Sequence, residues 1–382
     1  MAASSWSEHF DQALQQVASQ NRLRSRRVLA LHDLLDFGSN DYLGLRWHPA
    51  VLALTSGAEA ASLTAWGAGA SPLLSGYSSA QAMLERELAA FSQTSSALVF
   101  SSGYACNSGT VACLANADDL ILSDQLNHAS LIDGCRVSRA TTYVYPHCDV
   151  EHVREVLRRD RQRYRRVLLL TESIFSMDGD AAPLQALADL AEEFDGGLVV
   201  DEAHAVGVYG SQGSGLLEEL GLQTRALAKL GTLSKAIGGV GGYVAAADNL
   251  IEYLVNHCRS YMFSTAAPAF ILTLAAKSLQ LLREQSSQRQ ALRRQAADLR
   301  NALSQRGWSV LAGDSPIIPL LVGNEHRALL LSQQLWESGI YVPAIRPPTV
   351  PAHTCRLRIS LSTRHTPHDC QCLLEALGSP TE

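Results

Sequence analysis

Lys235 stands in a segment whose residue types suit covalent chemistry. The segment reads Gly-Thr-Leu-Ser-Lys-Ala-Ile-Gly-Gly-Val-Gly-Gly (231–242), and the 382-residue chain has only two other lysines, Lys229 and Lys277. Arginine stays protonated and cannot form a Schiff base, so a chain that relies on arginine should keep lysine where a nucleophilic amine is needed. Lys235 is therefore a candidate covalent catalyst. On the lysine alone, an ordinary surface position in a flexible loop is the alternative.

Asp201 and His204 form a second candidate group, at the end of Leu-Val-Val-Asp-Glu-Ala-His (198–204). The apolar run is too short for a helix and is typical of a buried parallel strand. Ligands of open α/β sheets bind beyond the carboxyl ends of strands, so both side chains should face a ligand crevice. A buried carboxylate there needs a cation, and a protonated pyridine nitrogen would serve. The alternative is a capping Asp201 and a core His204.

A candidate phosphate site follows the short apolar strand in Ala-Leu-Val-Phe-Ser-Ser-Gly-Tyr-Ala-Cys-Asn (97–107). Small residues after this strand open a helical pattern, and a helix start presents free backbone N–H groups to a phosphate. The hydroxyls of Thr232 and Ser234 could also bind an anion. Together with Lys235 and Asp201, these are the parts needed to hold pyridoxal phosphate.

The chain resembles the α-oxoamine synthases, fold-type I pyridoxal phosphate enzymes that join an amino acid to an acyl thioester with loss of carbon dioxide. The resemblance covers about residues 37–374. Besides the segments above, it rests on FGSNDYLGL (37–45), NHASL (127–131), ESIFSMDGD (172–180) and RLRIS (356–360).

This resemblance implies a role for individual residues. Lys235 would form the Schiff base with the cofactor and then move protons, Asp201 would keep the pyridine nitrogen protonated, and His128 would stack on the ring. His204 and Ser176 would hydrogen-bond the phenolic oxygen. The implied contacts on the phosphate side are Gly103, Tyr104 and Thr232, with Ser264 and Thr265 reaching in from a second subunit of a homodimer.

The resemblance also implies substrate contacts, and His128 is expected to be one of them besides its role at the ring. Arg358 would bind the amino-acid carboxylate bidentately, a geometry that lysine cannot reproduce. Arg24 and Thr349 would contact the acyl partner, although a basic run and a proline turn are alternative explanations for them. The segment AIRPPTVP (344–351) is similar to the branch that joins L-alanine to a pimeloyl thioester of coenzyme A or acyl-carrier protein. It favours that branch over the glycine acetyltransferase, aminolevulinate synthase and serine palmitoyltransferase branches.

Three departures from the family pattern affect the acyl-binding details. Gln81 stands where many members have histidine, and Ala-Ser-Pro (70–72) with Pro72 interrupts a glycine-serine-arginine stretch. His353 replaces a usual glycine. The expected cofactor site is untouched by these changes.

The order of elements predicts an α/β fold with a doubly wound, mostly parallel sheet. We expect an N-terminal helical arm (1–48), a large cofactor-binding domain (49–285) and a small C-terminal α+β domain (286–382). Strands are predicted at about Ala97, Leu120, Tyr143, Val167, Leu198 and Ala228, and in the small domain at 308–311, 317–322, 341–345 and 357–361.

Composition narrows the class of protein. A net charge of −6 argues against non-specific nucleic-acid binding, and the arginine runs at 22–27 and 158–166 are most simply solvated faces. With no apolar run of signal-peptide or membrane-spanning length, a cytoplasmic enzyme is expected. Most of the eight cysteines should be buried free thiols. His365, His368, Cys370 and Cys372 could be imagined as zinc ligands, but Thr-Pro-His-Asp (366–369) favours a helix start and no metal.

Two other classes compete with this interpretation. The strand at 198–204 also resembles the magnesium-binding strand of helicases, but such a motor needs Gly-Lys-Ser or Gly-Lys-Thr, and no lysine here follows a glycine. A catalytically silent relative that only scaffolds a partner would be expected to lose the Schiff-base lysine. Lys235 is present, which favours an enzyme.

Overall fold

The chain forms two compact units in a computed structural model that describes residues 2–29, 34–56 and 65–380. Unit 1 comprises residues 1–39, 177–179 and 294–382, and unit 2 comprises residues 40–176 and 180–293. The predicted division at residues 48 and 285 stays a prediction.

Unit 2 is built on a seven-stranded sheet in the order β2-β8-β7-β6-β5-β3-β4. The five strands from β7 to β4 are mutually parallel, whereas β8 is antiparallel to both of its neighbours. The mostly parallel sheet and all six predicted strands are thus confirmed. The strands are β2 Ser96–Phe100, β3 Leu120–Asp124, β4 Thr141–Tyr145, β5 Val167–Glu172, β6 Gly197–Asp201, β7 Ala228–Thr232 and β8 Gly242–Ala246.

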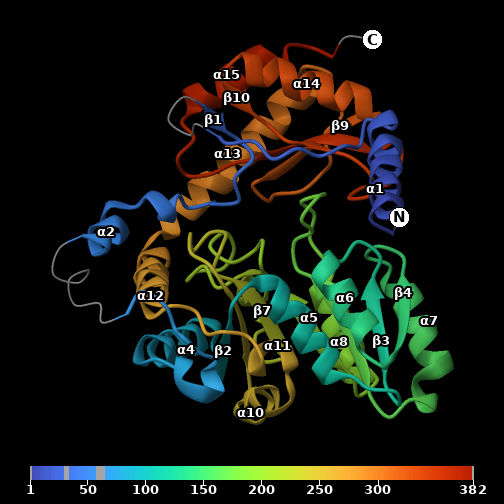
Figure 1. Cartoon of the computed structure of the whole chain (residues 1–382), viewed down its shortest axis with the longest axis vertical. Helices are drawn as coiled ribbons and strands as arrows, with labels where there is room; N and C mark the ends of the chain where they lie inside the picture. Colours follow the sequence, from blue (N-terminus) through green and yellow to red (C-terminus); the bar gives the residue numbers. More distant parts are fainter. Residues whose placement is uncertain (1, 30–33, 57–64, 381–382) are drawn as a thin grey trace. The chain divides into compact units, whose positions relative to one another are not determined.

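Helices pack around this sheet (Figure 1). They are α2 Pro49–Leu52, α4 Ser79–Ser92, α5 Gly103–Leu114, α6 Ala129–Val137, α7 Val150–Asp160, α8 Leu184–Glu193, α9 Leu216–Glu219, α10 Asp248–His257, α11 Arg259–Met262 and α12 Ala269–Glu284, with the short turns η1 Leu45–Trp47, η2 Ala53–Thr55, η3 Pro72–Gly76 and η4 Arg161–Arg163. The central strands are buried on both faces, which explains why they read as unbroken apolar runs in the sequence.

Unit 1 is a smaller α+β structure around a three-stranded antiparallel sheet, β11-β12-β9. Its elements are α1 Ala2–Ser19, β1 Leu35–Asp36, β9 Ile317–Gly323, α14 Glu325–Glu337, β10 Ile340–Tyr341, β11 Ala344–Ile345, β12 Cys355–Ser360 and α15 Pro367–Leu377; the arginine-rich helix α13 Ser286–Gln305 begins in unit 2 and ends in unit 1.

The helix start at Thr366 is confirmed. The Thr366 hydroxyl accepts a hydrogen bond from the backbone N–H of Asp369, and the Asp369 carboxylate accepts one from the backbone N–H of Thr366, which is a full capping box. All eight cysteines are free thiols and five of them are buried, as expected. No helix within the described ranges is long and apolar enough to cross a membrane.

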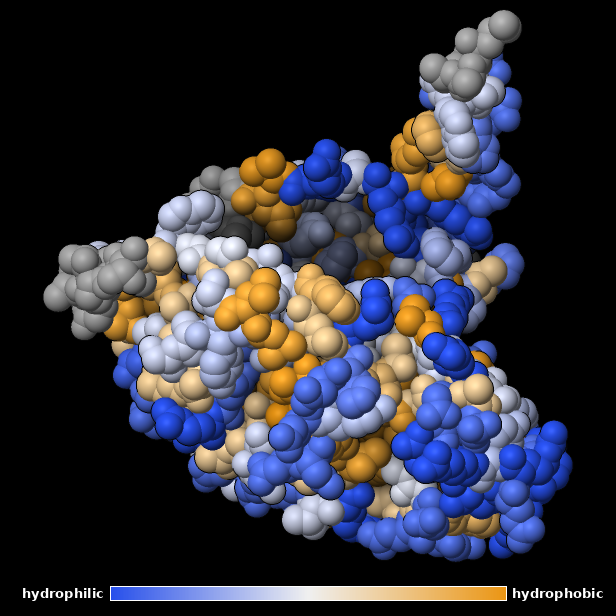
Figure 2. Space-filling model, turned by 60° about the horizontal axis from the view of Figure 1, so that its bottom comes forward, coloured by the Kyte–Doolittle hydropathy of each residue, from blue (hydrophilic) through white to orange (hydrophobic). Residues whose placement is uncertain are grey.

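On the face shown in Figure 2, polar side chains are interspersed with apolar ones that gather in places. Leu74 and Phe263 are among the most exposed large apolar side chains of unit 2, at 81% and 69%. Their segments lie side by side, because the backbone N–H of Ala266 donates to the carbonyl of Ala70. Among the described residues, these two segments present large apolar side chains at the surface of unit 2.

Candidate cofactor site

The carboxyl ends of the parallel strands bring several of the predicted site residues to one edge of the sheet in unit 2. Asp201 is the last residue of β6, and Thr232 is the last residue of the neighbouring β7. Gly103 begins α5 directly after β2, and His128 is the N-cap of α6 directly after β3. A mixture of helix starts and strand ends is the arrangement in which α/β sheets bind ligands.

The Asp201 carboxylate is buried and held by neutral donors. One oxygen accepts a hydrogen bond from the side-chain amide of Asn107 at 2.6 Å, and the other accepts one from the backbone N–H of Ala203 at 2.8 Å. These donors orient the carboxylate without neutralising its charge. The position therefore fits a cationic ring nitrogen, the partner that a pyridine cofactor would present.

Glu172 lies beside Asp201, opposite it in the register of β5 and β6. Burial, and secondly the charge of Asp201, raise the pKa of Glu172 well above its usual value. Two adjacent buried carboxyl groups cannot both ionise cheaply. Burial and the neighbouring charge therefore favour the protonated form of Glu172.

The phosphate side of the site is open enough for close backbone approach. A Cβ atom at Gly103 would lie 3.2 Å from the hydroxyl oxygen of Thr232, so a side chain here would require Thr232 to shift by a few tenths of an ångström. Thr232 in turn donates to the carbonyl of Gly241 and lies 2.8 Å from the Ser234 hydroxyl. The N-terminus of α5 and these hydroxyls suit a phosphate group.

The three lysines of the chain, Lys235, Lys229 and Lys277, lie in different surroundings. Lys229 is fully buried, and its Nζ donates to the backbone carbonyl and the hydroxyl of Ser214. Lys277 lies within helix α12. Lys235 follows the Thr232 turn and is only partly buried. Its role as the Schiff-base lysine stays a prediction.

His204 and Ser176 are also buried in unit 2. His204 Nδ1 lies 2.6 Å from the hydroxyl of Tyr42, a residue of the FGSNDYLGL segment that had no role assigned from the sequence. Ser264 and Thr265 line a small pocket with Phe100 and Ser101, close to the start of α5.

Tyr104 is exposed, and its hydroxyl donates to Asp133. Its ring meets that of His128 edge-on, at 6.3 Å between centroids. The implied role of Tyr104 at the phosphate therefore rests on its backbone, while its side chain borders His128.

Three of the four predicted substrate residues belong to unit 1, whereas the fourth, His128, belongs to unit 2. Arg358 is a buried residue of β12, and its Nη1 donates to the Ser360 hydroxyl at 2.6 Å. Arg24 and Thr349, 325 residues apart in the chain, are brought together, because Arg24 Nη2 donates to the Thr349 hydroxyl at 2.7 Å. Their roles toward substrates stay predictions.

Two of the departures from the family pattern, Gln81 and His353, can be described in their local surroundings. Gln81 is buried and donates to Glu85, which also accepts a hydrogen bond from the Tyr77 hydroxyl. His353 takes a left-handed backbone conformation, with φ of 64°. Glycine adopts that conformation without strain, so the replacement carries a small conformational cost.

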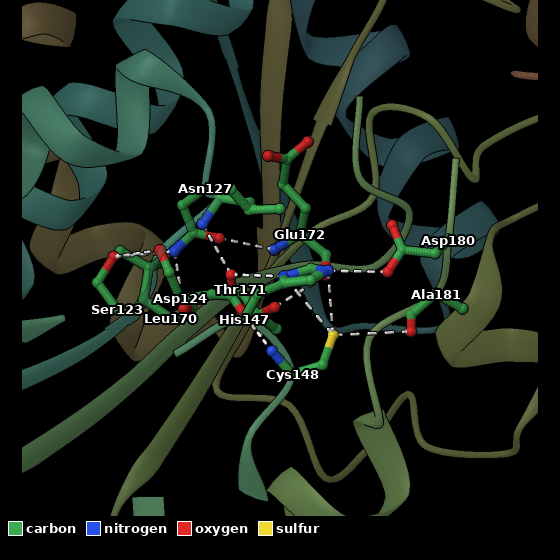
Figure 3. A network of polar contacts seen from close by, with 11 residues as sticks. Ser123, Asp124, Asn127, His147, Cys148, Leu170, Thr171, Glu172, Asp180 and Ala181 are labelled. Atoms are coloured by element: carbon green, nitrogen blue, oxygen red, sulfur yellow. Dashed lines mark hydrogen bonds and ion pairs between the residues drawn. The ribbon is translucent and has the colours of Figure 1, made fainter. Parts of the chain in front are cut away.

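A second histidine, His147, follows β4 and lies between two carboxylates (Figure 3). Its Nδ1 is 2.9 Å from Asp124 and its Nε2 is 2.8 Å from Asp180. Despite partial burial, hydrogen bonds to these carboxylates raise the pKa of His147 to about 12. The ring is an imidazolium that pairs with both carboxylates and thereby fixes Asp180, at the end of the loop that carries Ser176. We call this pair of contacts the His147 clamp.

Cys148 adds a sulfur to this cluster, so that Asp124, His147 and Cys148 place three possible metal-ligand atoms within 4.8 Å of one another. Both ring nitrogens already face carboxylates, and Sγ lies almost equally far from them, at 3.6 and 3.8 Å. The sulfur is thus beside the ring rather than directed at one ring nitrogen. We interpret the cluster as an ion-paired clamp.

Comparisons with known proteins agree with the geometry. The sequence pattern of the family described as Aminotransferase class I and II matches residues 32–377. The chain is 41% identical to 8-amino-7-oxononanoate synthase of Geobacter sulfurreducens over 96% of both chains, and 45% identical to that of Cupriavidus taiwanensis over 91% of this chain and 87% of the relative.

Solved structures show the same fold. A serine palmitoyltransferase of Sphingomonas wittichii has a TM-score of 0.90 at 29% identity, covering 98% of this chain and 96% of its own. An 8-amino-7-oxononanoate synthase of Francisella tularensis has a TM-score of 0.75 at 28% identity, covering 91% and 97%. A serine palmitoyltransferase of S. paucimobilis, 30% identical over 90% of this chain and 86% of its own with a TM-score of 0.85, is described with a bound PLP-myriocin aldimine.

Proposed function

The chain belongs to the aminotransferase class I and II family, and from this membership we propose that it joins L-alanine to a pimeloyl thioester, with loss of carbon dioxide, to give 8-amino-7-oxononanoate for biotin biosynthesis. The observation that carries this assignment is 41–45% identity to curated 8-amino-7-oxononanoate synthases over more than nine-tenths of the chain. The cofactor is pyridoxal phosphate, which supplies an electron sink for the carbanion at the α carbon of alanine.

The residues of the chain divide this work between them. Asp201 would hold the cofactor's pyridine nitrogen and favour its protonated form, and Lys235 would supply the amine that binds the cofactor and would carry the α proton at Nζ. Arg358 would hold and orient the alanine carboxylate. Arg24 and Thr349, which bond to each other, are proposed to meet the acyl partner.

A substrate matrix tests the assignment. Alanine, glycine and serine are each combined with pimeloyl, acetyl, succinyl and palmitoyl thioesters, and released thiol is measured. We expect the highest kcat/KM with alanine and the pimeloyl thioester. The preference for alanine over glycine should be modest, because one methyl group contributes only about 1–3 kcal/mol of discrimination. Higher kcat/KM with the acetyl or palmitoyl thioester would overturn the assignment.

A serine palmitoyltransferase-like reaction is the second candidate. Its support is the fold similarity to the S. wittichii enzyme, with a TM-score of 0.90. The glycine C-acetyltransferase-like reaction is the other family alternative. In the same matrix, serine with the palmitoyl thioester or glycine with the acetyl thioester would then give the highest kcat/KM.

Lys235 is proposed as the attachment point of the cofactor. Borohydride reduction of the holoenzyme followed by peptide mass spectrometry should place the label on Lys235, and Lys235→Ala should lose it. Label on Lys229 or Lys277 would contradict the assignment.

A homodimer with shared active sites is proposed from the match of Ser264 and Thr265 to residues that reach the phosphate from a second subunit. The exposed Leu74 and Phe263 give a second copy an apolar patch to cover. Mixing Lys235→Ala protein with Thr265→Ala protein should restore part of the activity lost in each, because a hybrid dimer contains one intact site. A fully active monomer at high dilution would refute the proposal.

A further inference from the structure

A chain of hydrogen bonds runs from Asp201 to His128 through two residues that the sequence did not single out. The side-chain nitrogen of Asn107 donates to Asp201 at 2.6 Å and to the hydroxyl oxygen of Ser130 at 3.0 Å. That hydroxyl oxygen lies 2.7 Å from Nδ1 of His128. Asn107, Ser130 and Asp201 are all buried, so water does not compete for these bonds.

The direction of each bond in this relay follows from the Asp201 end. Asn107 presents its NH₂ group to Asp201, whose carboxylate oxygen accepts the hydrogen bond. The second N–H of that group then donates to the Ser130 oxygen. The Ser130 hydroxyl keeps its own proton free to donate, and the acceptor within reach is Nδ1 of His128.

The backbone of α6 determines which nitrogen of His128 carries the proton. The backbone N–H of Ser130 also points at Nδ1 of His128, at 3.2 Å, which makes His128 the side-chain N-cap of the helix. A proton on Nδ1 would be directed against this N–H. Nδ1 therefore accepts from the Ser130 backbone and hydroxyl and carries no proton.

We propose that the relay Asp201–Asn107–Ser130 fixes His128 as a neutral imidazole with its proton on Nε2, so that Asn107 and Ser130 are positioning residues and His128 works as a hydrogen-bond donor. The tautomer stands on the contacts alone, and only its use in the reaction rests on the proposed function. In that reaction the Nε2–H can donate to an oxygen of a reacting group, while Nδ1 is not available to take up a proton.

The electrostatic surroundings agree with a neutral ring. Burial lowers the pKa of His128. The charge of Asp201 raises this pKa, and the positive charge of Lys235 lowers it further. Asp201 reaches His128 through a neutral amide and a neutral hydroxyl rather than by direct contact, so it polarises the ring without protonating it.

Nitrogen-15 NMR of holoenzyme labelled only at histidine tests the tautomer. The spectrum reports which ring nitrogen carries the proton, and His128→Gln identifies the signals of His128 by their loss. At pH 7.5 we expect a protonated Nε2 and an unprotonated Nδ1. An imidazolium, or a proton on Nδ1, would overturn the proposal whatever the substrate matrix shows.

Ser130→Ala tests whether the relay sets the tautomer. This variant removes only one hydroxyl; we expect the Nδ1-protonated form to become populated and kcat to fall about fivefold, the factor for one neutral hydrogen bond, with little change in KM for alanine. Ser130→Thr keeps a hydroxyl and should restore both the Nε2-protonated tautomer of His128 and the kcat of the parent protein. Ser138→Ala, which removes a hydroxyl from the other end of α6, is the matched control. An unchanged His128 spectrum in Ser130→Ala would overturn the relay.

Discussion

His128 and His147 follow neighbouring parallel strands of the same sheet, β3 and β4, yet their charges differ. Each nitrogen of His147 touches a carboxylate, which raises the pKa of the ring to about 12. His128 is separated from Asp201 by Ser130 and Asn107, and its pKa is lowered. A carboxylate in direct contact charges the histidine and makes it a clamp. A carboxylate that acts through neutral groups leaves the ring neutral.

Removing the charge at the head of the His128 relay should have the largest effect. Asp201→Asn keeps the shape of the side chain, but it no longer holds a proton on the ring nitrogen, and its amide can donate toward Asn107. We expect exchange of the α proton of alanine to slow by about two to four orders of magnitude. Proton NMR in deuterated buffer measures the exchange. An unchanged rate would remove Asp201 from this role.

Removing the clamp should act on stability. His147→Gln leaves the buried Asp124 carboxylate without its cation, and we expect the free energy of unfolding at pH 7 to fall by about 3 kcal/mol. Urea unfolding followed by circular dichroism measures the change. His152→Gln is a matched control, because that ring bonds only to the Tyr143 hydroxyl among the contacts described. A loss no larger than the control's would contradict the clamp.

The stabilisation by His147 should depend on pH in a defined direction. Its folded pKa lies above the unfolded value of about 6.5, so the stabilisation is complete below pH 6.5 and declines as the pH rises toward about 12. The stability difference between the parent protein and His147→Gln should therefore narrow between pH 6.5 and pH 9. A constant difference would indicate an uncharged ring.

His128 should show the opposite and smaller trend. Its folded pKa is lowered, so its contribution to stability is present above the unfolded pKa and is lost as the pH falls through the folded pKa. Relative to His128→Gln, the parent protein should lose stability between pH 7 and pH 5. If the parent protein instead gains stability over this range, His128 is charged in the folded state and the contrast with His147 fails.

Much of the fold was predictable because its signals are local. The six strands that were predicted are short apolar runs in the sequence. A helix start is indicated within four residues by Thr366, Pro367 and Asp369. Strand β8 was missed because Gly242–Ala246 is a short run without alternation that directly follows a glycine-rich segment. Its place between β2 and β7 depends on pairing with strands on both sides, one of them far away in the chain.

The candidate site also combines features that can be identified from local sequence with features that depend on long-range contacts. The sequence by itself identified the candidate reactive groups, which are the amine of Lys235 and the carboxylate of Asp201 at the end of a predicted buried strand. Tertiary structure alone decided how those groups are set. Asn107 meets Asp201 across 94 residues, and Tyr42 meets His204 across 162. Hydrogen bonds reach only about 3 Å, so the partners that fix a charge or a tautomer exist only once the sheet has brought its strand ends together.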